Sequence, residues 1–324
     1  MTHSSTFVGI DVSKDRLDVV CHPSQDCFHV PNTPDGIATL IARTQNGHSV
    51  YGCEASGGLE TNVIVALSEA GLACFCLHPS DVRAFARLKG KRAKTDRLDA
   101  LAIAEVLPVA ARHRAPTTRS RMQSNIRQLA TVRRQFGAMV AQLKSLKQMM
   151  CGGEMDPVLS DVIDDLAARI QALTRSMKAM IEKDRQSALL SKRIMSVPGA
   201  GPVLAAELIG AMPEIGTLSS RQVASLAGLA PHPRQSGKSS RPGRCQGGRG
   251  TIRRVLYMAA LSAIKARKAP FIATYERLRR NRKPFKVAIV AVMRKLIVTI
   301  NAIVKAQTTW QKNHPNENHA TTVA

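Results

Sequence analysis

Four carboxylates in the N-terminal third of the chain lie where predicted structural elements begin or end. Asp11 ends an apolar run, and Glu54 ends a second one. Asp96 and Asp99 are three residues apart, which places them on one face of a predicted helix. Carboxylates gathered at one point repel each other unless divalent cations lie between them, and such oxygen ligands suit Mg²⁺. The four residues together predict a two-metal site for phosphoryl transfer.

Each of these acids also has a simpler explanation when it is taken alone. Asp11 suits a turn, Glu54 suits the surface, and Asp96 suits the first turn of a helix capped by Thr95. It is their combination that favours the metal site. Glu60 follows a Gly-Gly turn six residues after Glu54, and we expect it to face solvent on the next helix.

A second candidate for chemistry is a serine in the loop predicted at 232–250, which is rich in Gly, Ser and Arg. A hydroxyl beside glycines and guanidinium groups is what serine attack on a phosphate requires. By residue type alone Ser236, Ser239 and Ser240 are equal candidates, and a flexible basic loop without catalysis is the simpler interpretation. The cations of this region expected to bind nucleic acid are Arg234, Lys238, Arg241, Arg244, Arg249, Arg253 and Arg254.

Charge is distributed unevenly along the 324 residues, whose formal net charge is +24. Residues 1–106 carry ten Lys and Arg against twelve Asp and Glu, whereas residues 231–300 carry eighteen Lys and Arg against the single acid Glu276. Such an excess of cations predicts a polyanionic partner, because Lys and Arg release counterions when they bind phosphates. Aromatic residues make up only 3% of the chain, so contact with the nucleic-acid backbone is expected to dominate over base stacking.

The elements that must position the carboxylates follow a recognisable order. Apolar and β-branched residues predict three consecutive strands between residues 6 and 30. A helix around Ile37 to Ile41, a strand at 49–53, a helix at 59–70 and a strand at 72–77 follow, with a further helix after them. This is the order of an α/β ribonuclease H-like (RuvC-like) domain, in which the strands ending at Asp11 and Glu54 are neighbours.

The rest of the chain is predicted to be mainly helical. Long helices at 119–150 and 157–190 should form an antiparallel, coiled-coil-like hairpin that serves as a spacer or dimer contact. The turn at 197–201 resembles a helix-hairpin-helix turn that could meet a phosphate, although an ordinary tight turn fits equally well. The predicted domains are 1–113 (RuvC-like), 114–190 (helical hairpin), 191–310 (mainly α, with the serine) and 311–324 (disordered tail).

Composition also limits the compartment. No apolar run approaches the ~20 residues of a spanning helix, and no signal peptide precedes Phe7, so we expect a soluble, cytoplasmic protein. The seven cysteines include no CxxC pair, and neither a zinc site nor a disulfide framework is indicated.

Six short motifs occur in order along nearly the whole chain: Gly9-Ile10-Asp11-Val12-Ser13-Lys14, Glu54-Ala55-Ser56-Gly57, Lys94-Thr95-Asp96-x-x-Asp99-Ala100, Pro198-Gly199-x-Gly201, Ser236-Gly237 and Gly247-Gly248-Arg249. Together they resemble the signatures of the DEDD insertion-sequence transposases, whose relatives include pilin-gene invertases and recombinases guided by a bridge RNA. Ser56 stands where that family usually has threonine, and both side chains carry a hydroxyl.

The resemblance implies roles that the residues alone leave open. It assigns Asp11, Glu54, Asp96 and Asp99 as an acidic tetrad that binds Mg²⁺, and Ser236, rather than Ser239 or Ser240, as the nucleophile that forms a phosphoserine with DNA. It further implies donor and target duplex DNA as substrates and a structured guide RNA as a partner. The tetrad of one subunit would meet the serine of another in a tetramer assembled from dimers.

Four other functions remain to be separated from transposition. A pilin-type invertase would use the same tetrad and serine. A RuvC-like nuclease would cut DNA without Ser236, and a non-catalytic binding protein would need only the basic half. An actin-like ATPase also begins with a strand-borne Gly-x-Asp, but it would repeat its fold in the C-terminal half, where helices are predicted here.

Overall fold

The computed structural model describes residues 5–90, 95–150, 155–236 and 239–310, without the side chains of 232–242. The chain divides into two compact units, residues 1–124 and 125–324, and each is described by itself. The elements of the first unit are β1 (Thr6–Val12), β2 (Arg16–His22), β3 (Cys27–Pro31), α1 (Pro34–Thr44), β4 (Ser49–Glu54), α2 (Thr61–Glu69), β5 (Cys74–Leu77), α3 (Pro79–Leu88) and α4 (Asp96–His113).

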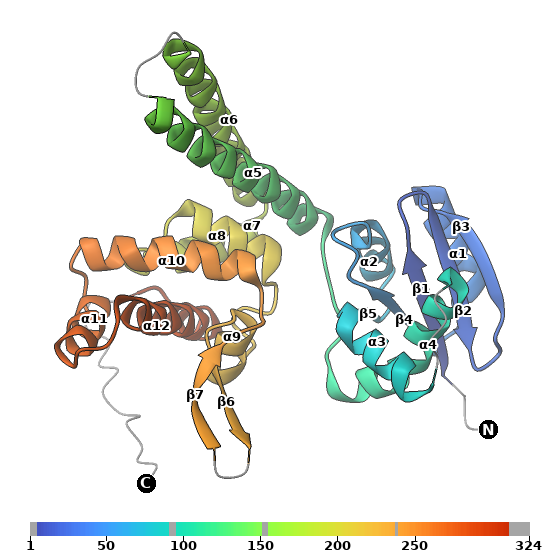
Figure 1. The fold of residues 1–324 in the computed structure, drawn as a ribbon. Helices are drawn as coiled ribbons and strands as arrows, with labels where there is room; N and C mark the ends of the chain where they lie inside the picture. Colours follow the sequence, from blue (N-terminus) through green and yellow to red (C-terminus); the bar gives the residue numbers. More distant parts are fainter. Residues whose placement is uncertain (1–4, 91–94, 151–154, 237–238, 311–324) are drawn as a thin grey trace. The chain divides into compact units, whose positions relative to one another are not determined.

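The five strands of the first unit form one mixed sheet in the order β3-β2-β1-β4-β5 (Figure 1). The β1–β2 and β2–β3 pairs are antiparallel, and the β1–β4 and β4–β5 pairs are parallel. The predicted order of strands and helices is confirmed, and the strand order is that of a ribonuclease H-like sheet. Strands β1 and β4 are neighbours, as the position of the carboxylates requires.

Alternating side chains give the sheet two different faces. Val8, Ile10 and Val12 of β1 are buried in a core shared with α1 and α2. The intervening residues of β1 face the other side, where α3 and α4 form a second core. Asp11 therefore lies on the face covered by α4.

Gly9 sets how closely α4 approaches this face. A Cβ atom built on Gly9 would lie 2.1 Å from the backbone oxygen of Ala100 and 2.5 Å from the backbone nitrogen of Ala104. Both atoms belong to α4, so any side chain at this position would push the helix away from β1. Because α4 carries Asp96 and Asp99, Gly9 also sets their distance from Asp11.

The second unit is mainly helical. Its elements are α5 (Arg121–Met150, whose first turn belongs to the first unit), α6 (Asp156–Lys183), α7 (Arg185–Ser196), α8 (Pro202–Ala211), α9 (Ser220–Leu226), β6 (Pro231–Ser236), β7 (Ser239–Cys245), α10 (Gly250–Lys265), α11 (Phe271–Arg280) and α12 (Phe285–Lys305). The prediction of one helix over 157–190 is wrong, because the helix is interrupted at Asp184. The Asp184 carboxylate caps α7 by accepting from the Ser187 N–H at 2.8 Å.

Helices α5 and α6 form the predicted antiparallel hairpin (Figure 1). Arg133, early in α5, donates to Thr174, late in α6, at 3.0 Å. Lys147, late in α5, pairs with Asp156 at the start of α6 at 3.3 Å. A further ion pair of 2.6 Å between Arg134 and the buried Glu207 fastens α5 to α8.

Helix α12 is the central helix of this unit and corrects the expectation about apolar runs. It is 21 residues long and contains an 18-residue stretch with a mean hydropathy of 2.1, so it is long and apolar enough to cross a membrane. In the structure α12 packs against α7, α9, α10 and α11, and ten of its residues are buried. Its apolar character is therefore that of a core helix surrounded by other helices.

Candidate active site

The first carboxylate, Asp11, lies near the end of β1 and is partly buried. Across the antiparallel pair it stands opposite Asp18 of β2, and residues paired in this way share a face of the sheet. Asp18 was not among the acids predicted from the sequence. It adds a further negative charge to the face that α4 covers.

The second carboxylate, Glu54, ends β4. Gly9 pairs with Gly52 and Ile10 with Cys53 in the parallel ladder. Alternation then places Glu54 on the face of Gly52, where a Cβ atom would meet Leu107 of α4 at 2.5 Å. Asp11 and Glu54 thus lie on the same face of neighbouring strands.

The expectation that Glu60 faces solvent is wrong. Its side chain is only 2% exposed, and its Oε2 accepts hydrogen bonds from the Ser56 N–H and hydroxyl at 3.1 Å and from the Gly58 N–H at 2.8 Å. Burial acts to raise the pKa of Glu60, but these donors outweigh it and the pKa is lowered. The turn that follows Glu54 is therefore folded around the Glu60 carboxylate, with Gly57 and Gly58 at positive φ.

This arrangement predicts a structural effect of Glu60 on the neighbouring Glu54. Glu60→Ala leaves partly buried N–H groups without their acceptor, so it should destabilise the protein by about 1–3 kcal/mol in urea unfolding and weaken divalent-cation binding. Glu60→Gln keeps one accepting oxygen and should restore most of both properties. Glu69→Ala, which removes an exposed ion pair with Arg121, is the control and should leave stability close to that of the wild type. Equal losses in Glu60→Ala and Glu69→Ala would contradict the prediction.

The third and fourth carboxylates begin α4, as the sequence predicted. The Thr95 hydroxyl caps the helix by accepting from the Leu98 N–H at 3.3 Å. Asp96 is exposed and Asp99 is partly buried. Together with the close approach at Gly9, this cap positions the first turn of α4 beside β1.

Electrostatics shows that these elements bring the carboxylates near one another. The pKa of Asp11 is raised to about 6, first by burial and then by the charges of Asp99, Asp96, Glu54 and Asp18. Over the described part of the chain, however, no three acid, histidine or cysteine side chains lie close enough to hold a metal ion. Asp96 instead forms an ion pair with Arg16 at 3.0 Å.

The donor chemistry fits a divalent cation. All four tetrad residues supply carboxylate oxygens, which hard ions such as Mg²⁺ prefer. The pKa of Asp11 is raised first by burial and then by the neighbouring carboxylates, so negative charge is concentrated on this face. A bound cation would neutralise that charge, with Asp11, Glu54, Asp96 and Asp99 as the residues to hold it.

The predicted serine lies on a β-hairpin rather than in an irregular loop. Strands β6 and β7 pair in antiparallel fashion, and Ser236 stands opposite Ser239 at the end of the hairpin (Figure 1). Their side chains, and those of Arg234, Lys238 and Arg241, lie outside the described residues. The choice of Ser236 over Ser239 therefore stays a prediction.

Two of the predicted DNA-binding arginines have partners within the protein. Both terminal nitrogens of Arg249 bind the Glu214 carboxylate, at 2.6 and 2.7 Å. Arg253 donates to the backbone oxygens of Gly228 at 3.2 Å and Gly247 at 3.0 Å. These contacts fasten the segment after β7 to the helical body. Arg244 and Arg254 are exposed.

A basic turn between α11 and α12 is the cation cluster that residue-by-residue reasoning missed. Within ten residues it gathers six exposed cations, which are Arg277, Arg279, Arg280, Arg282, Lys283 and Lys286. The nearby acid Glu276 is paired with Arg267 at 3.0 Å. The excess of cations over 231–300 contained the signal, but no motif marks this turn as it marks the serine loop.

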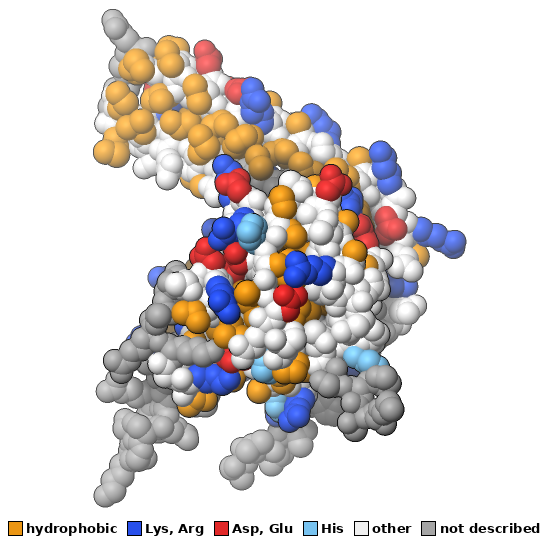
Figure 2. Space-filling view, turned by 90° about the vertical axis from the view of Figure 1, so that its right-hand side faces the viewer, with side chains coloured by type: hydrophobic (Ala, Val, Ile, Leu, Met, Phe, Trp, Pro, Cys, Tyr) orange, Lys and Arg blue, Asp and Glu red, His pale blue; other side chains and the backbone are white. Residues whose placement is uncertain are grey.

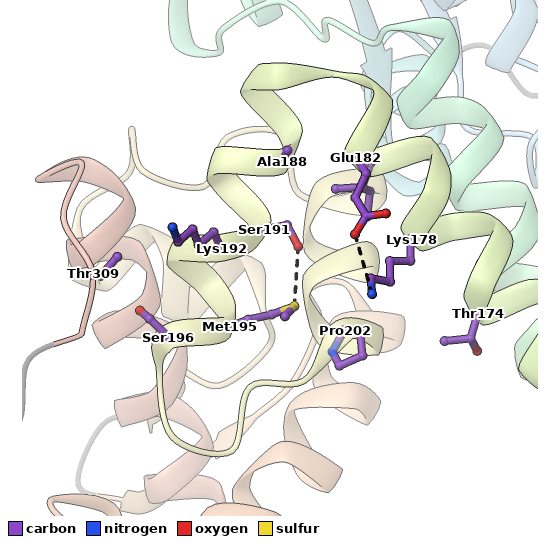
Figure 3. A pocket seen from close by; sticks show the side chains of 11 residues that line it. Thr174, Lys178, Glu182, Ala188, Ser191, Lys192, Met195, Ser196, Pro202 and Thr309 are labelled. Carbon is purple, nitrogen blue, oxygen red and sulfur yellow. Dashed lines mark hydrogen bonds and ion pairs between the residues drawn. The ribbon is translucent and has the colours of Figure 1, made fainter.

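A cavity of about 510 Å³ lies in the second unit (Figure 3). It is bordered by α6, α7 and the start of α8. Its acid, Glu182, is paired with Lys178 at 3.6 Å, and the Ser191 hydroxyl contacts the Met195 sulfur at 3.6 Å. The lining offers no arrangement for phosphoryl transfer, so the carboxylate face is the better candidate.

A ribonuclease H-like sheet with clustered acids, in a chain that also carries a basic helical unit, defines a class of DNA-acting phosphoryl-transfer enzymes. Residues 191–276 match the model of the "Transposase IS116/IS110/IS902 family", and residues 8–151 match a model of DEDD transposases of the IS110 type. Together the two models match more than half of the chain, which belongs to this family of transposases. The chain is accordingly a DNA recombination enzyme.

Full-length relatives carry a related description. The chain is 23% identical over 320 residues to the "Pilin gene-inverting protein" of Moraxella bovis, and the match covers 95% of this chain and 98% of the relative. The same identity and coverage hold for the protein of that name from Moraxella lacunata. The likeness therefore extends across both units.

Proposed function

We propose that this transposase cleaves and rejoins duplex DNA with Ser236 as the nucleophile and with Mg²⁺ bound by Asp11, Glu54, Asp96 and Asp99. The observation that supports the proposal is that Asp11 and Glu54 lie on the same face of neighbouring strands, the face covered by the helix that begins at Asp96. The experiment is recombination of donor and target duplexes by the full-length protein with and without Mg²⁺. Recombinant junctions formed in excess chelator would contradict it.

In the proposed reaction the Ser236 oxygen forms a bond to the scissile phosphorus, and the bond from phosphorus to one sugar oxygen breaks. The proton of the serine hydroxyl ends on that sugar oxygen, so the step is balanced and can be reversed on a new strand. Bound Mg²⁺ would stabilise the charge that develops on the phosphoryl oxygens. The chain's own contribution is to place the carboxylates through β1, β4 and α4 and the serine through the β6–β7 hairpin.

We assign the basic turn between α11 and α12 a role in holding the DNA backbone. Replacing Arg277, Arg280 and Lys286 by glutamine should weaken duplex binding uniformly across sequences. The slope of log affinity against log salt should fall by about 0.9 for each phosphate that the variant no longer neutralises. Binding titrations at several salt concentrations measure both effects.

A matched triple variant controls for the change in net charge. Arg175, Lys183 and Arg185 are also exposed in the second unit and lie on α6 and α7. Their replacement by glutamine removes the same charge and should leave the salt slope nearly unchanged. Equal slopes for the two triple variants would contradict a specific role of the basic turn.

The helical hairpin of α5 and α6 supports a homo-oligomer, which we propose is a dimer that assembles to a tetramer. A heptad series of apolar residues runs along α5 and consists of Leu129, Val132, Phe136, Met139, Leu143, Leu146 and Met150. Val132, Met139 and Leu146 of this series are 42–47% exposed, and hydrophobic side chains gather along the α5–α6 arm (Figure 2). A second copy of α5 would bury them. Sedimentation measures this state, and a monomer at all concentrations would contradict it.

We also propose a structured guide RNA as a partner of this transposase. A structured RNA partner rests on the family resemblance and fits the many cations and few aromatic residues. Recombination undiminished by ribonuclease treatment would contradict it.

The name of the Moraxella relatives favours DNA inversion as the alternative to transposition, and sequencing the product junctions separates the two. The proposed site of action is the bacterial cytoplasm, which cell fractionation tests.

A further inference from the structure

Arg16, at the start of β2, links two carboxylates that come from different elements. Its Nε donates to Asp18 Oδ2 at 2.9 Å, and its Nη2 donates to Asp96 Oδ2 at 3.0 Å. Asp18 stands opposite Asp11 in the sheet, and Asp96 begins α4. One guanidinium group therefore lies at the edge of the carboxylate face and holds one of its four proposed metal ligands.

The two ion pairs differ in how firmly they are held. The Asp18 side chain is 17% exposed and shares a strand with Arg16, whereas the Asp96 side chain is 65% exposed and lies on the first turn of a helix. An exposed ion pair contributes little and exchanges partners easily, while a less exposed one is screened less by water. Asp18 thus anchors the guanidinium, and Asp96 is the partner that can leave.

Charge gives this arrangement a consequence for metal binding. A cation beside the tetrad attracts the same carboxylates as a divalent ion and repels that ion. The Asp96 oxygen that accepts from Arg16 is also one of the oxygens a metal ion would need. Neutralisation by Arg16 agrees with the finding that the described carboxylates are not gathered for metal coordination.

We propose that Arg16 is an internal counter-ion of the tetrad, which holds Asp96 before metal binding and gives it up when a divalent cation binds. Arg16 is a positioning residue in this proposal, because it acts on Asp96 rather than on the reacting atoms. After the exchange the guanidinium stays tethered to Asp18. The inference rests on the proposed metal site.

The competing explanation is a purely structural clamp between β2 and α4. A clamp stabilises the fold equally with and without metal, and its loss would not improve metal binding. The proposed exchange predicts the opposite pattern. Without Arg16 the divalent ion competes only with water for Asp96, so the metal binds more tightly. The variant is destabilised chiefly in the metal-free state.

The test is Arg16→Gln in the full-length protein, with Mn²⁺ binding followed by electron paramagnetic resonance and Tm measured in chelator and in saturating Mg²⁺. We expect Mn²⁺ to bind about two- to fivefold more tightly, the range that an exposed ion pair allows. Tm should fall in chelator and recover in Mg²⁺. Arg16→Lys keeps the charge but has a single nitrogen for two carboxylates, so its Mn²⁺ affinity should lie between those of the wild type and Arg16→Gln.

Arg114→Gln is the matched control, because it breaks a similarly exposed ion pair with Asp81 at 2.8 Å in the same unit. Its Mn²⁺ affinity should equal that of the wild type. If the wild type binds Mn²⁺ but Arg16→Gln binds it equally or more weakly, the counter-ion role is overturned and the metal site stands. If the wild type binds no Mn²⁺, both the metal site and the inference fall.

Discussion

Ser236→Ala is expected to abolish DNA recombination, with a loss on the order of 10⁴-fold or more, while duplex binding stays close to that of the wild type. Removing a nucleophile eliminates the covalent step and leaves binding to the cations of the chain. The measurement is trapping of a covalent protein–DNA adduct, followed by mass spectrometry of the attached peptide. The wild type should yield the adduct at Ser236, and the variant should yield none.

Ser239→Ala is the matched control, because Ser239 stands opposite Ser236 in the same hairpin. It should retain adduct formation and recombination. An adduct on Ser239, on a tyrosine or on no residue at all under active conditions would refute the assignment. Undiminished Mg²⁺-dependent cleavage by Ser236→Ala would instead identify a RuvC-like nuclease, in which the carboxylates act through water.

Asp11→Asn is expected to lower recombination about 10³-fold or more and, in the absence of metal, to make the protein more stable. The activity falls because a neutral amide is a poor ligand for a divalent cation. Stability rises because the substitution removes a charge that the folded protein disfavours through burial and through Asp99, Asp96 and Glu54. A residue with only a structural role would lose stability when replaced.

The pH dependence of this stability follows from the sign of the pKa shift. In the folded protein the pKa of Asp11 is raised from 3.8 to about 6, so ionisation costs stability as pH rises between these values. Asp11→Asn should therefore match the wild type below about pH 4 and exceed it above about pH 6. The expected gain is about 1 kcal/mol, less than the full shift implies, because water screens a partly exposed carboxylate.

Urea unfolding in chelator at pH 4 and pH 7 measures the gain, and the same experiment in Mg²⁺ should reverse the order, because metal stabilises only the protein that binds it. Asp26→Asn is the control, since Asp26 is exposed and paired with Arg43 at 3.2 Å. It should retain recombination. A metal-free Asp11→Asn that is less stable than the wild type at pH 7 would show that the charge repulsion is misassigned.

Much of the first unit could be predicted because its pattern is local. Alternation of apolar residues along β1 assigns Val8, Ile10 and Val12 to one face and Asp11 to the other, whatever the strand packs against. The Thr95 cap of α4 is likewise a contact between near neighbours. Motifs such as Gly9-Ile10-Asp11 then identified the family, and both family models agree with that identification.

Two features were not predicted from the sequence, the burial of Glu60 and the ion pair of Arg249. The first is a choice between a solvent-facing and a buried side chain, and the second depends on a partner that is distant in sequence. Glu60 is a charged residue of the kind usually found at the surface, but the turn before it directs the partly buried N–H groups of Ser56 and Gly58 toward its carboxylate. Arg249 belonged to a basic segment, yet Glu214, thirty-five residues earlier, binds its guanidinium. No spacing rule reports such pairings.

Reading the sequence was enough to predict an α/β unit with clustered carboxylates followed by a basic helical unit, and to select the carboxylates and the serine to test. These predictions were possible because local charge, the spacing of apolar residues and short motifs are all properties of short segments. The folded structure was needed to find that Asp18 joins the carboxylate face, that Arg16 holds Asp96 and that Glu60 is buried. Those facts depend on how β2, β4 and α4 pack across the sheet, where burial and neighbouring charge set what each side chain can do.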